Sequence, residues 1–375
     1  MRLTSDSEQP ANKGSLHRYP CPGCGANLLF EPEDGCLVCP YCGRKEIIPE
    51  NSAQVQERSY EDYLRPQAGQ LKALAENALE VRCDGCGAIV TFSPPDVAGD
   101  CSFCGVPIVA QPKSADPLVS PEGILPFALS QTQSGEAVKQ WISSRWFAPN
   151  ALKRLASQES VDGVYLPFWT YDAFTTSYYT GQRGEHYYVT ETYTEQDAQG
   201  NTVTRTRQVQ RTRWYAASGT VERWMDDVLV PATTSVSRPR LTSLEPWDLA
   251  ALKPYEPIYL PGFKAQRYQI DLPQAFEEAK TIMAPIIRQD VIEDIGGDEQ
   301  RVDEVVTSYS AVTFKHLLLP VFIGAYRFRE KIYQVLVNAR TGEVQGDRPY
   351  SFWKIFFLVW FLLAVIAAIV YFGNR

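Results

Sequence analysis

Histidine is scarce in this chain. The 375 residues include three, His17, His186 and His316, which are scattered along the sequence. None falls in the paired-histidine motif of metalloproteases or beside the nucleophile of a hydrolase motif. The phosphate-binding loop Gly-x-x-x-x-Gly-Lys-Ser/Thr is also missing, which excludes a nucleotide hydrolase of the P-loop type. Because no catalytic set emerges, we expect a protein that is not an enzyme.

The N-terminus has no apolar segment, and the chain has no excess of positive charge. Residues 1–15 are polar, which excludes the apolar core of a signal peptide. The chain carries 36 basic against 44 acidic residues, a net charge of −8. Nucleic-acid binding depends on clustered Lys and Arg that neutralise phosphates. Nucleic acid is therefore not the expected partner.

Cysteine, in contrast, follows a repeated pattern. Eight of the nine cysteines form four Cys-x-x-Cys-Gly units, and a spacer of 14 residues separates the two units of each pair. Each ligand position of the second pair lies 62 residues after its counterpart in the first. The predicted ligands are Cys21, Cys24, Cys39 and Cys42 in the first set and Cys83, Cys86, Cys101 and Cys104 in the second. Because a short turn can place both sulfurs on one side, this duplication predicts two zinc ribbons.

Four thiolates in a tetrahedron suit Zn²⁺, and a site with all four positions filled is structural. Iron is the alternative, because the turn Cys39–Gly43 also resembles a rubredoxin knuckle. Each ribbon is too short to bury a core of its own, so the metal would supply most of its folding free energy. Cys36 has no counterpart in the second copy, where Ala98 stands. We interpret Cys36 as a spare thiol, with a ligand that competes with Cys39 as the alternative.

The C-terminus contains the longest apolar run. Residues Ile355–Phe372 are 18 apolar, aromatic or small residues without interruption. At about 1.5 Å per residue a helix of this length spans about 27 Å of hydrocarbon. Trp353 and Tyr371 lie where interfacial aromatic residues are typical. We predict a single transmembrane helix that leaves the N-terminal bulk of the protein in the cytosol, where thiols stay reduced.

The region between the ribbons and the tail contains predicted helices and long strands. Apolar spacing predicts helices over 60–79, over 134–147 with Ser134 as N-cap, and over 272–295 with a kink at Pro285. From Val164 onward, residues that favour strands dominate. A phrase with a central proline recurs at 165–169, 259–263 and 318–322, and we expect each copy at the start of a sheet segment. A second hairpin is predicted over 332–344, around the turn 338–342.

The clearest predicted hairpin covers 185–213, with its turn at 197–201. In the returning strand Arg205, Arg207, Arg211 and Arg213 share one face. Glu and Tyr residues of the first strand lie opposite them if the register matches. We favour this cross-strand pairing, with contact of the arginines with anionic headgroups as the alternative.

The layout as a whole resembles a known bacterial family. The resemblance depends on the two cysteine modules, the segment Leu166–Ala173, the strand Leu319–Phe322, the segment Asn338–Val344, and the C-terminal span. Members are membrane-anchored tandem zinc-ribbon proteins, often labelled primosomal protein N-prime (replication factor Y) or superfamily II helicase-like. The resemblance implies association with phage-shock-protein-A-like and stomatin/flotillin-type proteins in membrane-stress assemblies.

The sequence therefore predicts an α+β multidomain protein with two small zinc ribbons, a β-rich mixed domain and one C-terminal transmembrane helix. The predicted segments are a disordered N-terminus (1–18), ribbon 1 (19–48), a helical spacer (49–80), ribbon 2 (81–110), the β-rich domain (115–350) and the transmembrane helix (352–372). The predicted function is a tail-anchored membrane scaffold that docks protein partners. A nucleic-acid-binding ribbon protein linked to replication is the alternative.

Overall fold

The computed structural model describes most of the chain downstream of the N-terminal segment. The described residues are 19–49, 51, 53–64, 79–83, 86–92, 98–103, 107–109, 119–147, 149, 161–196, 201–328, 331–347 and 351–373. The predicted disordered segment 1–18 and the metal ligand Cys104 lie outside them. So does 65–78, most of the predicted helix 60–79.

Strands dominate the described residues, and two of the helices are long and C-terminal. The strands are β1 Leu29–Glu31, β2 Cys36–Val38, β3 Lys45–Glu46, β4 Arg58–Ser59, β5 Leu79–Arg82, β6 Ile89–Phe92, β7 Ala98–Asp100, β8 Pro107–Val109, β9 Gly123–Ile124, β10 Asp162–Gln196, β11 Thr202–Pro231, β12 Lys253–Pro254, β13 Lys264–Ala265, β14 Glu299–Phe328, β15 Lys331–Asn338 and β16 Val344–Gly346. The helices are α1 Tyr60–Leu64, α2 Gln131–Ser144, α4 Arg238–Thr242, α5 Leu272–Ile295 and α6 Phe352–Gly373, with 3₁₀ turns η1 Leu249–Ala251 and η2 Pro257–Tyr259.

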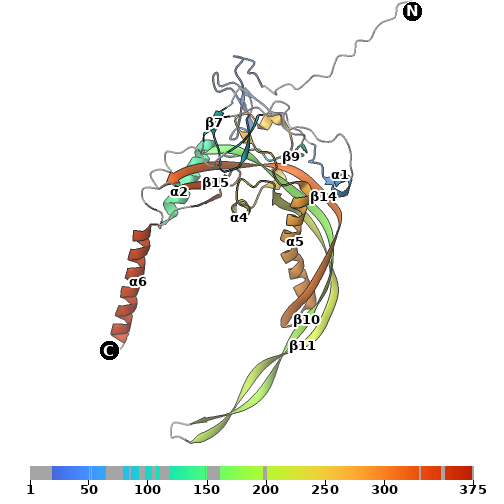
Figure 1. Cartoon of the computed structure of the whole chain (residues 1–375), viewed down its shortest axis with the longest axis vertical. Coiled ribbons are helices and arrows are strands. Elements are labelled where there is room, and N and C mark those ends of the chain that lie inside the picture. The colour runs from blue at the N-terminus through green and yellow to red at the C-terminus, as the bar shows by residue number, and fades with distance from the viewer. Residues whose placement is uncertain are drawn as a thin grey trace, which may run out of the picture.

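A large sheet built on three long antiparallel strands forms the body. β10 lies between β11 and β14 and pairs with both along most of its length. Near the ribbons, the sheet widens through β9, β12, β13, β15 and β16, and the hairpin β5–β6 joins it through β13. Figure 1 shows the long strands curving away from this wide end and past α5. The body is therefore wide at the ribbon end and narrow at the other.

Helix α5 covers one face of the narrow part of the sheet. Its buried side chains recur about every four residues, which places them on one helical face. They pack against Trp169, Tyr171 and Phe314 of the sheet. The helix has the predicted bounds, begins at the N-cap Asp271 and contains Pro285 in its interior. The 3.6-residue apolar period was thus sufficient to locate this element.

Helix α2 begins three residues before the predicted N-cap. Its N-cap is Ser130, whose hydroxyl accepts from the N–H of Gln133 while the Gln133 side chain accepts from the N–H of Ser130. This reciprocal capping box satisfies two backbone donors. Ser134, the predicted cap, is buried within the helix. The prediction of Ser134 was wrong, because the capping box at Ser130 fixes the start of the helix.

The predicted spacer helix is confirmed only at its beginning. Helix α1 covers Tyr60–Leu64, but Leu79 begins strand β5. The prediction of helix at Leu79 was therefore wrong. Tyr60 packs against Phe276 of α5 and Tyr63 against Phe314 of β14. These contacts hold the segment after ribbon 1 on the body.

The repeated proline phrases do not start strands. Pro167 lies inside β10 and Pro320 inside β14, while Pro261 follows the 3₁₀ turn η2. Each of the two strand prolines lies where its strand changes its outer neighbour, from β13 to β11 along β10 and from β9 to β15 along β14. Proline has no backbone N–H, but this removes no hydrogen bond between strands at these two positions, because the N–H would point to the gap between the two successive outer strands.

A partly buried ionic network lies where the long strands carry bulges. Near Asp172 the pairing register of β10 shifts with respect to both of its neighbours, β11 and β14. The Asp172 carboxylate accepts the backbone N–H of Asp227 at 2.5 Å, and Asp227 has a positive φ of 47°. Lys315 Nζ reaches Asp227 at 2.7 Å and Glu57 at 3.2 Å. The network thus ties the segment between the ribbons to the centre of the sheet.

Beyond Gly184 and Glu299, the β10–β11 hairpin continues without β14 as a two-stranded arm (185–196 and 201–213). Figure 1 shows this arm extending past the end of α5. Its register pairs Glu185 with Arg213, Glu191 with Arg207 and Tyr193 with Arg205. Arg211 reaches Glu191 at 2.6 Å, and Arg213 lies over the ring of Tyr187. The predicted cross-strand pairing is confirmed, and the hairpin around 338–342 is also present as β15–β16.

Helix α6 is long and apolar enough to cross a membrane, and none of its apolar window is buried in the protein. It begins where the Ser351 N–H donates to the Phe147 carbonyl, and Lys354 Nζ donates to the Trp146 carbonyl. In Figure 1 the helix stands apart from the sheet. The aromatic and aliphatic side chains along it are exposed, as expected of a segment whose solvent is lipid.

Candidate metal centres

The four cysteines of the first set come together in one cluster. Their Sγ atoms all lie within 4.8 Å of one another. Cys21 and Cys42 Sγ are 3.5 Å apart, and Cys24 and Cys39 Sγ are 3.4 Å apart. A tetrahedral zinc site with Zn–S bonds of about 2.3 Å places its sulfurs about 3.8 Å apart. The four sulfurs therefore fit a single four-coordinate metal ion.

The second set is described at three of its four positions. Cys83, Cys86 and Cys101 also place their Sγ atoms within 4.8 Å of one another, with 3.7 Å between those of Cys86 and Cys101. The fourth predicted ligand, Cys104, lies outside the described residues. The structure therefore brings together seven of the eight predicted ligands in the two expected groups.

Three cysteine turns share one backbone pattern. In each, the N–H of the first cysteine donates to the carbonyl five residues later, and the N–H of the glycine four residues later donates to that cysteine's carbonyl. These bonds are Cys21 with Ala26 and Gly25, Cys39 with Arg44 and Gly43, and Cys83 with Ala88 and Gly87, all at 2.7 to 3.0 Å. The three glycines have φ values of 76°, 70° and 74°. A Cβ is disfavoured at such φ values, which explains the glycine after each pair.

The turns of the first cluster also favour the thiolate form at their first cysteines, Cys21 and Cys39. The Gly23 N–H points at Cys21 Sγ at 3.4 Å. At Cys39 the backbone N–H of Cys42 contributes most to lowering the thiol pKa, which is about 6. Backbone donors aimed at sulfur stabilise the charged form, the form that binds metal. Within the first cluster the thiol pKa is thus lowered at Cys21 and Cys39, whereas it is raised at Cys24 and Cys42.

Cys36 lies outside the metal clusters. It is a buried residue of β2, and burial raises the pKa of its thiol. The group of four sulfurs includes Cys39 and not Cys36. This arrangement favours the interpretation of Cys36 as a spare thiol, which packs in the ribbon as a small apolar side chain.

Ribbon 1 packs on the body. Its strands β1, β2 and β3 form a small sheet of their own, but Phe30 of β1 lies against the rings of Tyr259 and Phe263. The Phe30 N–H donates to the Pro261 carbonyl at 3.0 Å. Ribbon 1 therefore packs on the second proline phrase, residues 259–263. No sequence pattern indicated this contact.

Ribbon 2 is joined to the body more directly. Its hairpin β5–β6 extends the main sheet through the pair Ala265 and Thr91. Phe103, which follows Cys101, is fully buried, and its carbonyl accepts from the Gln334 side chain. Lys264 Nζ lies 3.0 Å from Ser102 Oγ. Both cysteine clusters are consequently fixed relative to the sheet.

Of the histidines, His186 and His316 are described, and neither joins a cysteine cluster. His186 Nε2 lies 2.8 Å from a Glu299 carboxylate oxygen at the base of the arm. His316 is fully buried, and a ring nitrogen lies 3.1 Å from the Val119 carbonyl. Burial lowers the pKa of His316 to about 4, so its imidazole is neutral at pH 7.

No family model matches this chain, and no solved structure matches it. The uncharacterized protein YdjG of Bacillus subtilis (strain 168) is 24% identical to it over 353 residues, which are 92% of each chain. The similarity is therefore not confined to the cysteine segments but also extends through the β-rich region. It adds no ligand, partner or reaction to what the residues indicate.

Proposed function

We propose that this protein is a tail-anchored, non-enzymatic membrane scaffold. In this proposal α6 crosses the membrane, and the ribbons and sheet lie in the cytosol as surfaces that dock partner proteins. The observation that carries the proposal is the joining of both cysteine clusters to one body that ends in an unburied apolar helix. Such a construction holds loops in a fixed shape beside a bilayer, which is what a docking platform requires.

The metal in this proposal is Zn²⁺, one ion in each ribbon, with iron as the alternative. All four positions of the first site are filled by sulfur. A closed four-thiolate site has no open coordination position for a substrate or water, so its contribution is structural. Cys21, Cys24, Cys39 and Cys42 would hold the first ion, and Cys83, Cys86, Cys101 and Cys104 the second.

The proposed partners are phage-shock-protein-A-like and stomatin/flotillin-type proteins, in a membrane-stress assembly. The test captures the tagged full chain from detergent-solubilised membranes and identifies co-purified proteins by mass spectrometry. Capture should fall several-fold when Cys39→Ser and Cys101→Ser are combined, because both ribbons lose shape without metal. A reproducible ATPase or nuclease activity of the purified chain would contradict the proposal.

A salt titration separates this function from nucleic-acid binding through the ribbons. Residues 19–48 carry Arg44 and Lys45 against four acidic residues, and 81–110 carry Arg82 against three. The purified chain should therefore show no affinity for single- or double-stranded DNA or RNA that falls steeply with added salt. Micromolar binding with such a salt dependence would favour the alternative function, because that dependence marks phosphate neutralisation.

A further inference from the structure

The narrow part of the sheet has an uncovered edge. Among the described residues, β11 pairs with β10 alone, from Thr202 to Pro231. Such an edge presents unpaired N–H and C=O groups along the strand, and soluble proteins usually shorten or cover it. This edge is 30 residues long and is therefore a candidate site for pairing with another strand.

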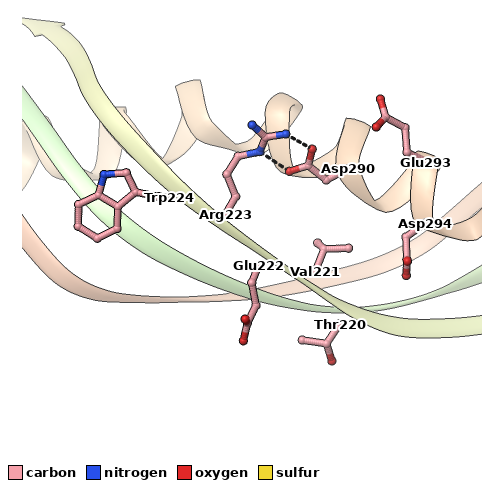
Figure 2. A pocket seen from close by; sticks show the side chains of 8 residues that line it. All are labelled: Thr220, Val221, Glu222, Arg223, Trp224, Asp290, Glu293 and Asp294. Atoms are coloured by element: carbon pink, nitrogen blue, oxygen red, sulfur yellow. Dashed lines mark hydrogen bonds and ion pairs between the residues drawn. The ribbon is translucent and has the colours of Figure 1, made fainter.

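A hollow lies beside this edge. Its volume is about 660 Å³, and it is lined by 220–224 of β11 and by Asp290, Glu293 and Asp294 of α5. Figure 2 shows the three acidic side chains of α5 arranged along the helix next to the strand. The hollow thus joins a free strand edge to a row of carboxylates.

The hollow is strongly acidic. Four of the eight residues that line it are acidic, and Arg223 is the only cation among them. Arg223 Nε donates to the Asp290 carboxylate at 2.5 Å, and the same guanidinium makes a second contact with it (Figure 2). Arg223 therefore neutralises Asp290 and leaves Glu293 and Asp294 of α5 with a combined charge of −2, while Glu222 points to the other face of the strand (Figure 2).

The opposite face of the same strands exposes aromatic side chains. Trp224 is paired with Phe174, and Tyr178 with Thr220, so all four lie on the face away from α5. The exposed fractions are 51% for Trp224 and 54% for Tyr178. A strand added to the β11 edge would therefore find carboxylates on one face and aromatic rings on the other.

We propose that the β11 edge binds an extended segment of a partner protein that carries Lys or Arg at every second residue. Its backbone pairs with β11 around 220–224. Its basic side chains, which share one face because strand side chains alternate, reach Glu293 and Asp294. The intervening side chains contact the Trp224 side. This inference rests on the proposed docking function and names a partner chemistry for it.

A second copy of this chain fits the edge less well. Two β11 edges related by a two-fold axis near residue 222 would bring both sets of α5 carboxylates to one junction. Like charges placed close together cost free energy and oppose such pairing. Charge complementarity therefore favours a basic segment over self-association.

The test uses the full chain in detergent and three labelled peptides, (Lys-Thr)₅, (Glu-Thr)₅ and (Lys-Pro)₅, in fluorescence anisotropy titrations. We expect (Lys-Thr)₅ to bind and (Glu-Thr)₅ not to bind. The (Lys-Pro)₅ peptide keeps the charge but lacks the N–H of every second residue and has a fixed φ of about −65° at those positions, so it should bind at least about tenfold more weakly. Equal binding of the two lysine peptides would overturn strand addition.

Paired variants locate the binding. Glu293→Gln with Asp294→Asn should weaken (Lys-Thr)₅ binding about tenfold, because both carboxylates line the hollow on its α5 side. Asp303→Asn with Glu304→Gln removes the same charge from exposed positions of β14 and should leave binding unchanged. An equal effect of the two pairs would overturn the assignment.

Hydrogen exchange completes the test. Binding of (Lys-Thr)₅ should protect backbone amides of 219–225 from exchange. Absence of that protection, or the same protection without peptide at rising protein concentration, would overturn the proposal, the latter in favour of a second copy. Partner capture by the cysteine variants is measured separately. If capture depends on the ribbons but the peptide fails to bind, strand addition at the β11 edge is rejected and the docking function stands. If both fail, the docking function is rejected.

Discussion

At the scale of single residues, two buried thiols of ribbon 1 give a matched comparison. Cys39 belongs to the sulfur cluster, and Cys36 does not, although both are buried. We expect Cys39→Ser to lose one bound metal ion per chain and Cys36→Ser to keep the full content, because removal of a ligand opens the tetrahedron.

Elemental analysis of the purified full-length variants measures that content directly. Equal metal loss in both variants would show that Cys36 competes for the ion. Retention of both ions by Cys39→Ser would show that the cluster does not bind metal as proposed.

Two neighbouring buried groups give a prediction on pH. His316, with its pKa lowered to about 4, binds fewer protons folded than unfolded between pH 6.5 and 4, so its contribution to stability is lost as pH falls. Burial raises the pKa of Glu122 to about 7, so this carboxyl binds more protons when folded and opposes that loss. His316→Gln should therefore make the acid loss of stability shallower, and Glu122→Gln should make it steeper.

Urea unfolding of both variants and the parent in detergent, at steps from pH 7.5 to 4.5, measures these slopes. Metal loss at low pH affects all three proteins, so differences between them isolate the two groups. Slopes that shift in the same direction in both variants would contradict the assigned shifts.

At the scale of elements, the arm is predicted to be dispensable for the fold. Beyond Gly184 its strands pair with each other, and most of its side chains are exposed. Replacing 187–211 by Asn-Gly, which favours a tight hairpin turn, should lower the thermal midpoint by less than about 4 °C.

Thermal unfolding in detergent and metal content together check this result. A control deletion of β15 and β16 should prevent folding, because β15 contributes buried residues to the core. A large loss of stability on removing the arm would show that it packs on the body.

At the scale of the whole molecule, α6 should determine where the protein resides. Truncation after Ser351 removes a helix whose apolar window is unburied, so the remaining chain should fold, bind the same metal and leave the membrane fraction. Fractionation of cells that express each form measures this. A truncated chain that stays with membranes would indicate a second membrane contact, and the Arg-lined arm would be the first place to seek it.

The chain by itself determined the features set by local spacing. Cysteine repeats identified both sulfur clusters, apolar spacing located α5, the uninterrupted apolar run located α6, and strand alternation gave the residues that share a face of the arm. These succeed because residues close in sequence dictate short-range geometry. The error at Ser134 is also local, since Ser130 and Gln133 form the better capping box.

Only the tertiary structure decided which surfaces meet. Three features join residues far apart in sequence. They are the contact of Phe30 with Pro261, the extension of the sheet by ribbon 2, and the acidic hollow between β11 and α5. Such contacts depend on the curvature and bulges of long strands, which one-dimensional patterns do not encode. Local spacing therefore set the modules of this protein, and sheet geometry set how they are joined.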